Sequence, residues 1–414
     1  MEIAEQKKVR VPKLRFREFE DGWNSDSIEN LSSVITSGSR DWAQFYAEVG
    51  DLFVRMTNLS RDGIDLNLNS LKYVQLPPEH SEGTRTGLES GDILISITAE
   101  LGKIGWVPED LGRAFINQHT ALVRINSKAD SKFIAHNLAR KSTNTRLNRL
   151  NDSGAKSGLN LSTIQGFRLT VPTLPEQQKI ASFLSAVDER LGHLARKKQL
   201  LEQYKKGVMQ QLFSQQLRFK REDGSDYEDW EEKRLGKVGV IVSGLTYSPT
   251  DIHDDGVLVL RSSNVHNRQV TFTDNVFVKV EDGAFNPVQL NDILICVRNG
   301  STRLIGKNAL ISKEAVGKAF GAFMAVYRSK NNAFLFHWFD TPSYKKEVHK
   351  NLGATINSIN GSDLKKFKVP FPCQEEQQKI ADFLSSLDRK IEAVSAQIAL
   401  TQQFKKGLLQ EMFV

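Results

Sequence analysis

Two stretches of the chain have the same spacing of hydrophobic residues. Stepping by seven from Ile180 meets an apolar residue every time as far as Val208. The same steps from Ile380 reach Leu408 with a single polar exception, Thr401. A heptad spacing kept over several heptads is typical of a long helix that pairs as a coiled coil. We therefore expect two long helices, each with one apolar stripe for a partner.

The polar residues of the two stretches are repeated as well. The run Glu-Gln-Gln-Lys-Ile-Ala at 176–181 returns at 376–381, 200 positions later. Matching stripes at a fixed distance indicate an internal repeat, and they predict that the two helices pair with each other. The residues expected to form this pairing are the apolar members of the two stripes: Ile180, Phe183, Leu184, Val187, Leu191, Leu194, Leu201, Ile380, Phe383, Leu384, Leu387, Ile391, Val394 and Ile398.

The segments that precede each long helix have a different pattern, with short apolar runs between turn residues. Residues 92–97 and 120–125 are rich in β-forming side chains, which is typical of strands. After Ser131 the spacing changes and predicts a polar helix. Residues 291–295 repeat the start of the first of these strands, again at a distance of about 200 positions.

The chain is therefore expected to alternate between globular domains and helices. The predicted fold class is α+β, with two mixed, β-rich globular domains joined by two long helices and related by an internal pseudo-twofold repeat. The two helices match closely in sequence, whereas the two globular domains share only a framework. The expected boundaries are 1–173 for the first globular domain, 174–214 for the first helix, 215–372 for the second globular domain and 373–414 for the second helix.

Composition narrows the functional classes only a little. The 414 residues include 56 Lys and Arg against 49 Asp and Glu, a formal net charge of +7, which permits a polyanionic partner without requiring one. No apolar run approaches the length of a membrane span and the N-terminus has no apolar signal region, so we expect a cytoplasmic protein. Cys296 and Cys373 lack metal-ligand spacing and are expected to be ordinary buried thiols, without metal or disulfide.

Two segments resemble catalytic motifs without matching them. Residues 300–307 approach a phosphate-binding loop, but their glycines have the wrong spacing and Asn308 stands where Ser or Thr is needed. Asp92, Glu100 and Lys103 superficially resemble the carboxylate–lysine set of a nuclease, but a turn at the entry to a strand is the simpler interpretation of Asp92. The chain has no Asn/Asp-Pro-Pro-Tyr/Phe motif of an amino-methyltransferase. We therefore expect a chain without a catalytic site.

The order of domains and helices resembles that of a known family. The run Leu-Pro-Glu-Gln-Gln-Lys-Ile at 174–180, which closes a β-rich domain and opens a long helix, is similar to the specificity subunit of type I restriction–modification enzymes. So are Gly-Asp-Ile-Leu-Ile-Ser at 91–96, Gly-Lys-Ile-Gly at 102–105 and Asn-Gln-His at 117–119. The resemblance covers the whole chain in the domain order of the family.

The resemblance implies a DNA-binding specificity subunit that catalyses nothing by itself. Each globular domain would be a target recognition domain that reads one half of a bipartite, asymmetric site in double-stranded DNA. The helices would pair antiparallel, set the spacer between the half-sites and dock two modification subunits. Those partners would bind S-adenosylmethionine and methylate adenine at N6, and two restriction subunits would use ATP and Mg to translocate and cut DNA in anti-phage defence. The chain itself would hold no cofactor.

Residues that contact DNA are expected in loops that follow the framework strands, because Arg, Asn and Gln read base edges and basic or amide groups bind phosphates. The candidates in the first domain are Arg55, Asn58, Thr98, Lys103, Gln118 and His119, with Arg140, Lys141 and Lys156 as phosphate contacts. The candidates in the second domain are Arg261, Asn264, Arg298, Asn299, Arg303 and Lys307. Asn58 and Asn264 have a structural alternative, because asparagine side chains also build turns.

Two other functional interpretations stay open on the sequence. The chain could be a structural adaptor whose β-rich domains bind proteins, with the helices as a coiled-coil scaffold. It could also be the DNA-binding part of a restriction enzyme that works alone, which would require catalytic motifs that this sequence lacks. A steep loss of DNA affinity with salt would exclude the adaptor, because phosphate contacts release counterions.

Overall fold

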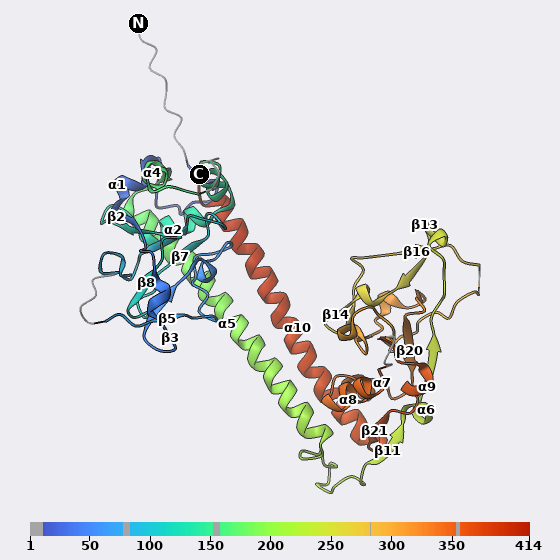
Figure 1. The fold of residues 1–414 in the computed structure, drawn as a ribbon. Helices are drawn as coiled ribbons and strands as arrows, with labels where there is room; N and C mark the ends of the chain where they lie inside the picture. Colours follow the sequence, from blue (N-terminus) through green and yellow to red (C-terminus); the bar gives the residue numbers. More distant parts are fainter. Residues whose placement is uncertain (1–10, 78–82, 152–157, 282, 353–356) are drawn as a thin grey trace. The chain divides into compact units, whose positions relative to one another are not determined.

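Both long helices expected from the heptad spacing are present in the computed structural model of the protein (Figure 1). They are α5 (Leu174–Phe213) and α10 (Gln374–Glu411). No helix in the part of the chain that is described meets the length and apolarity needed to cross a membrane. The structure describes residues 11–77, 83–151, 158–281, 283–352 and 357–414.

The chain divides into two compact units, and each long helix contributes to both of them. Unit 1 consists of residues 1–195 and 396–414, and unit 2 consists of residues 196–395. Each unit therefore contains one globular domain, the first part of the helix that follows it and the last part of the other helix. This division differs from the four consecutive segments expected from the sequence, because half of each helix packs with each globular domain.

Unit 1 is built on two small sheets that bring distant strands together. In one sheet, of strand order β2-β9-β6-β7, all neighbours are antiparallel; in the other, of order β3-β5-β4-β8, β4 and β8 run parallel. A separate antiparallel pair, β1 with β10, joins the two ends of the globular domain. The strands are β1 (Asn24–Ser27), β2 (Ser32–Ser37), β3 (Tyr46–Ala47), β4 (Asp51–Val54), β5 (Tyr73–Val74), β6 (Ile93–Ser96), β7 (Ile104–Trp106), β8 (Ala114–Ile116), β9 (Thr120–Ile125) and β10 (Arg168–Val171).

The helix expected after Ser131 is divided in two and is less polar than expected. Arg140, with φ −55° and ψ 135°, lies outside the helical region and separates α2 (Ser131–Ala139) from α3 (Lys141–Asn148). Helix α2 begins at the cap Asp130, and it buries Phe133 and other apolar side chains in the main core of the unit. The short helices of this domain are α1 (Ile28–Leu31), α4 (Leu161–Gly166), η1 (Trp42–Phe45), η2 (Met56–Asn58) and η3 (Thr84–Thr86).

Unit 2 repeats this plan with a larger sheet. Its strand order is β12-β20-β17-β18-β15-β14, beside a smaller sheet β16-β13-β19 and the antiparallel pair β11 with β21. The strands are β11 (Glu231–Arg234), β12 (Val240–Ser243), β13 (Ile252–Leu260), β14 (Val265–His266), β15 (Gln269–Val270), β16 (Phe277–Val278), β17 (Ile293–Cys296), β18 (Asn308–Leu310), β19 (Ala319–Phe320), β20 (Met324–Arg328) and β21 (Lys368–Phe371). The helices are α6 (Leu235–Val238), α7 (Asn332–Trp338), α8 (Pro342–Lys350), α9 (Gly361–Leu364), η4 (Pro249–Asp251), η5 (Ser262–Asn264), η6 (Thr302–Leu304) and η7 (Lys313–Ala315).

The apolar stripes of the long helices are buried most deeply at their ends. In unit 1, Ile180 and Leu184 of α5 share a core with Leu408 near the end of α10, and in unit 2, Leu384 of α10 shares a core with Leu212 of α5. The two segments in each unit therefore run antiparallel. Val187, Leu387 and Val394 are also buried. The other predicted pairing positions are half-buried, namely Leu191, Leu194, Leu201, Ile391 and Ile398.

Two of the predicted pairing residues have a different partner. The ring of Phe183 packs edge-on against Phe16, and the ring of Phe383 packs edge-on against Phe219, with centroids 5.9 and 5.8 Å apart. Phe16 and Phe219 lie near the starts of the two globular domains. These two stripe positions thus attach each domain to the helix that follows it.

Candidate nucleic-acid interface

The two framework asparagines predicted to contact DNA are buried inside their own loops. Asn58 is 2% exposed and Asn264 is 0% exposed. The side-chain oxygen of Asn58 accepts a hydrogen bond from Arg55 N at 3.0 Å, and that of Asn264 accepts from Arg261 N at 2.9 Å. Each amide nitrogen donates to two backbone carbonyls. The prediction that these asparagines read bases is therefore wrong, and the turn-building alternative holds.

The arginines beside these asparagines are also occupied. Arg55 donates from Nη2 to the backbone oxygen of Ser70 at 3.1 Å. Arg261 forms an ion pair with Asp274, with Nη2 and Oδ2 3.0 Å apart. Both side chains are half-buried. A DNA contact by either arginine would have to compete with these bonds, so the structure gives both of them a loop-stabilising role.

Three predicted residues of the first domain do come together. Thr98 follows β6, while Gln118 and His119 form the turn between β8 and β9. Thr98 Oγ1 lies 2.8 Å from His119 Nδ1, and Gln118 Nε2 lies 3.2 Å from His119 Nε2. All three side chains are half-buried. We call this group the first loop cluster; its exposed edge offers hydroxyl, amide and imidazole groups for hydrogen bonding.

The corresponding place in the second domain combines a cation with an aromatic ring. Arg298 and Asn299 follow β17, and Phe323 lies in the turn between β19 and β20. The guanidinium of Arg298 lies over the ring of Phe323, 5.7 Å from its centroid. Asn299 Nδ2 donates to Ser262 Oγ at 3.1 Å. We call Arg298, Asn299 and Phe323 the second loop cluster.

Backbone hydrogen bonds show that His119 and Phe323 occupy the same place in the two domains. His119 O accepts from Ile97 N at 3.0 Å, and Phe323 O accepts from Val297 N at 3.0 Å. Phe323 was missed as a candidate because the second domain has no Asn-Gln-His run. The signal was available in the strands, since 320–327 aligns with 116–123 and places Phe323 opposite His119.

The other basic candidates differ in whether their side chains are bonded within the protein or exposed. Lys103 forms an ion pair with Glu100 at 2.5 Å, and Lys307 donates to the backbone oxygen of Ser262 at 3.3 Å. Arg303 in η6 and Lys141 at the start of α3 have exposed side chains. These two are therefore better placed for phosphate contacts than Lys103 and Lys307.

Arg140, predicted as a phosphate contact, instead packs on the end of the chain. Its guanidinium lies over the ring of Phe413, 5.2 Å from the centroid, and Nη2 donates to the backbone oxygen of Val414 at 3.2 Å. Burial lowers the pKa of Arg140. Its role is to hold the C-terminal segment against the first domain. Lys156 lies outside the described residues.

Each globular domain is attached to its helix by a buried carboxylate at the start of that helix. Glu176 accepts from Arg15 at 2.8 and 2.7 Å and from the indole of Trp23 at 3.3 Å. In unit 2, Glu376 is bonded in the same way by Arg218 and Trp230. Both glutamates are fully buried, and the hydrogen bond to Glu176 raises the pKa of Arg15. In the sequence these sites are marked by the Glu that opens the repeated run at 176 and 376, and by Leu-Arg-Phe and Trp, which recur at 14–16 and 217–219 and at 23 and 230.

A second repeated group joins each domain to both helices. In unit 1, His136 of α2 lies beside Asp188 of α5, which forms an ion pair with Lys405 of α10. In unit 2, His337 of α7 lies beside Asp388 of α10, and Asp388 forms an ion pair with Lys205 of α5. We call these groups the two His–Asp–Lys clusters. Each cluster joins one position of α5 to one position of α10, and so it fixes the register of the helix pairing inside its unit. The two clusters lie at repeat-related positions.

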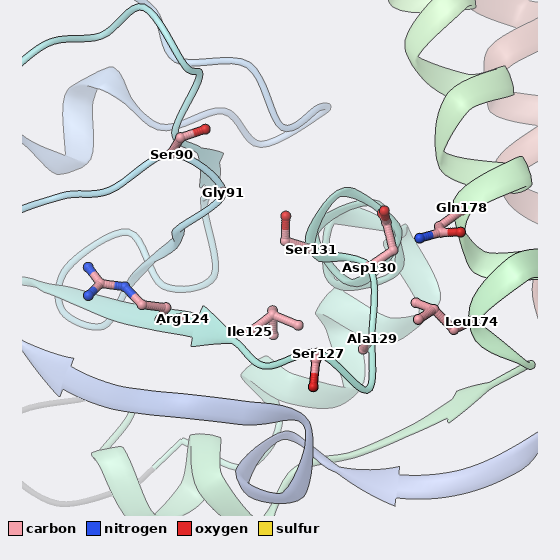
Figure 2. A pocket seen from close by; sticks show the side chains of 10 residues that line it. All are labelled: Ser90, Gly91, Arg124, Ile125, Ser127, Ala129, Asp130, Ser131, Leu174 and Gln178. Atoms are coloured by element: carbon pink, nitrogen blue, oxygen red, sulfur yellow. The ribbon is translucent and has the colours of Figure 1, made fainter.

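Figure 2 shows the side chains that line a surface hollow of about 290 Å³ in unit 1. This hollow is separate from the first loop cluster. It is lined in part by Gly91, which precedes β6, and by Arg124 near the end of β9, whereas the first loop cluster lies at the opposite ends of these strands. Arg124 is held by Asp92 at 2.8 Å through both carboxylate oxygens, and this bond raises the pKa of Arg124. Asp92 also accepts from Glu89 N, so the strand-entry turn is its role, rather than a nuclease site.

The two cysteines differ in burial. Cys296 at the end of β17 is fully buried, and burial raises the pKa of its thiol to about 11. Cys373, between β21 and α10, is half-buried, and both thiols are free. The expectation of a buried thiol is therefore confirmed for Cys296 only.

The comparisons with known proteins agree with the repeated domain-and-helix plan. The family profile described as type I restriction modification DNA specificity domain matches residues 63–203 and 227–402. A Methanocaldococcus jannaschii protein assigned by name to the MjaX type I restriction enzyme as its specificity subunit is 26% identical over 97% of this chain and 95% of its own length. The EcoKI specificity subunit of Escherichia coli is 27% identical over 44% of this chain and 41% of its own length.

The fold is also shared with solved structures. The type I restriction–modification S subunit from M. genitalium superposes with a TM-score of 0.63 at 16% identity, covering 98% of this chain and 99% of that one. A chain from a structure titled for complex assembly and conformational transition of the type I R-M system superposes with a TM-score of 0.55 at 18% identity, over 95% and 97% of the two chains. The protein belongs to the family of type I restriction–modification DNA specificity subunits.

Proposed function

We propose that each globular domain reads one half of a bipartite, asymmetric DNA site, and that the two long helices set the spacer and dock the modification subunits. The observation that carries this proposal is the loop cluster that the framework presents twice. The two clusters occupy equivalent places and differ in chemistry, with His119 in one and Phe323 in the other. Two domains that read different DNA sequences require the same backbone framework with different side chains in the loop that contacts DNA.

The charge of the second domain supports a nucleic-acid partner. Arg298 and Arg303 are exposed in the same connection between β17 and β18, and the 298–307 segment contains no acidic residue. Arginine in such a position can read guanine or bind phosphate. A gel shift of the chain with its modification subunit should therefore show an affinity that falls steeply with salt. An affinity independent of salt would favour the adaptor.

Exposed apolar side chains on the helices support a docking role. Leu200 and Tyr204 lie one turn apart on α5, and Leu400 and Phe404 occupy the same repeat positions on α10. All four side chains are 47–66% exposed and therefore face solvent. Two equal apolar patches suit two copies of one partner.

The docking surface can be tested by changing one patch at a time. Replacing Leu200 with Asp should remove one of two bound modification subunits, and replacing Leu400 with Asp should remove the other. Native mass spectrometry of the assembled complex counts the subunits directly. Gln199→Asp adds the same charge at an exposed neighbouring position and should leave both subunits bound. Retention of both subunits by each leucine variant would exclude these patches as docking sites.

Catalysis is assigned to partner subunits in this proposal. The modification subunits would bind S-adenosylmethionine and methylate one adenine on each strand, and restriction subunits would use ATP and Mg to translocate and cleave DNA. The contribution of this chain is to hold those subunits at a defined sequence.

Domain exchange tests the central claim. Residues 215–372 are replaced with the corresponding domain of another specificity subunit, and the methylated sites are mapped in genomic DNA. One half-site should change while the other half-site stays as in the parent. A simultaneous change of both half-sites would show that the domains do not read separately.

A further inference from the structure

Phe323 is an exposed aromatic residue on a rigid turn. Its side chain is 57% exposed, although Phe320, three positions before it, and Met324, directly after it, are buried. Phe323 O accepts two hydrogen bonds, from Val297 N at 3.0 Å and from Arg298 N at 3.1 Å. Ala322 N donates to Leu245 O at 2.8 Å. These bonds hold the backbone of the turn in place, and the ring of Phe323 is exposed upon it.

Arg298 is free to act together with this ring. No ion pair of Arg298 occurs among the residues that the structure describes, in contrast to Arg328, which is paired with Asp292 at 2.7 Å. The guanidinium of Arg298 lies over the Phe323 ring, an arrangement that orients its plane. The pair therefore presents an apolar surface and a planar cationic donor side by side.

Each of these two groups has one preferred complement in the major groove. The C5-methyl group of thymine is the apolar group on the base edges, and an aromatic side chain can contact it. The O6 and N7 atoms of guanine accept two hydrogen bonds from one guanidinium. We infer that the second loop cluster reads a thymine through Phe323 and a neighbouring guanine through Arg298. This inference rests on the proposed DNA-reading function of the second domain.

The first domain lacks this chemistry at the equivalent place. His119 is half-buried and engaged with Thr98 and Gln118 through polar contacts. Its edge is suited to hydrogen bonding rather than to a methyl group. At this place in the framework, only the second domain is therefore expected to sense a thymine methyl group, and only in the half-site that it reads.

The test uses the complete complex of the chain with its modification subunits. Each thymine of the second half-site is replaced in turn with uracil, which pairs identically but lacks the methyl group. One such replacement should lower kcat/KM for methylation about four-fold, as expected for one methyl group that loses its apolar contact. Phe323→Ala should lower kcat/KM on the thymine duplex by at least that factor and should make the thymine and uracil duplexes equal.

Arg298 is tested in the same assay with the neighbouring guanine replaced by 7-deazaguanine, which lacks the N7 acceptor. The wild-type complex should lose about ten-fold in kcat/KM, and Arg298→Ala should no longer distinguish the two duplexes. Phe277→Ala, which changes another exposed aromatic residue of unit 2, should keep the wild-type rate and both sensitivities. Equal thermal melting of the variants excludes misfolding.

Several results would overturn the inference. One is a wild-type complex that ignores uracil at every position of the second half-site. Another is a Phe323→Ala complex that is slower but keeps the full sensitivity to uracil, since the ring would then act without touching the methyl group. A third is unstacking beside the ring, seen as increased 2-aminopurine fluorescence that Phe323→Ala abolishes, because the ring would then be a wedge. If domain exchange still moves one half-site, these results leave the proposed function intact.

Discussion

Acidification should weaken both units through two buried histidines. His136 in α2 is 1% exposed and His337 in α7 is 2% exposed. Nε2 of His136 lies 4.0 Å from an oxygen of Asp188, and Nδ1 of His337 lies 3.9 Å from an oxygen of Asp388. Burial, together with a neighbouring cation, Lys405 in unit 1 and Lys205 in unit 2, lowers the pKa of each imidazole to about 3.

The size of the effect follows from this shift. The unfolded chain has histidines of pKa about 6.5, so between that value and about 3 the unfolded state binds a proton that the folded state does not. The free energy of unfolding therefore falls as pH decreases through this window. Between pH 7 and pH 5, each histidine should cost about 2 kcal/mol, one in each unit.

Hydrogen exchange with mass spectrometry can measure the two units separately, because α2 and α7 lie in different units. Protection of α2 should decrease between pH 7 and pH 5 beyond the intrinsic rate change, and His136→Gln should remove most of that decrease without altering the decrease in α7. His337→Gln should do the reverse. His193, exposed on α5, supplies the control His193→Gln, which should change neither. If both histidine variants keep the wild-type pH dependence, the reasoning is wrong.

Three other changes test the helix pairing and the repeat. Asp188→Asn leaves Lys405 buried without its partner and should lower the free energy of unfolding of unit 1 by about 3 kcal/mol in chemical denaturation. Exchanging the two residues should recover much of this loss, and no recovery would show that the pair is not a direct interaction. Inserting one heptad after Lys197 and one after Gln397 nearly preserves the apolar stripes and should lengthen the preferred spacer by roughly three base pairs. Methylation of duplexes with varied spacers measures the spacer, and an unchanged spacer in the folded variant would show that the helices do not determine it. The fragment 1–216 exposes the stripe of α5 and should form a twofold dimer that, with modification subunits, methylates a palindrome of the first half-site; a stable monomer in light scattering would contradict the pseudo-dimer.

The long helices were predictable because their signal is local and repeated. A heptad stripe needs only residues a few positions apart, so Ile180 and Leu184 could be placed on one face before any partner was known. The recurrence of the stripe 200 positions later then identified the partner. The same repeat gave the alternation of β-rich domains and helices, and the family followed from that order.

The loop residues could be located in the sequence, but their roles could not be assigned from it. Asparagine is a residue type that reads bases, yet the buried side-chain amides of Asn58 and Asn264 close turns within their own loops. Arg140 has the charge of a phosphate contact but lies on Phe413, which is distant in sequence. Burial and the partner of a polar side chain depend on segments that meet only in the folded chain, so residue type alone cannot decide between a ligand contact and a structural bond.

Tertiary structure also decided which positions of the two domains correspond. The sequence aligned the strands, whereas the backbone bonds of Val297 to Phe323 and of Ile97 to His119 made the turns equivalent. Those bonds place a ring and a guanidinium at one edge of the second domain. Sequence periodicity determined which elements form and which faces they bury, because both depend on neighbours along the chain. Which side chains the loop clusters expose depended on the sheets, which bring distant loops together. The residues of these loops have no regular spacing in the sequence, so sequence periodicity could not reveal their contacts.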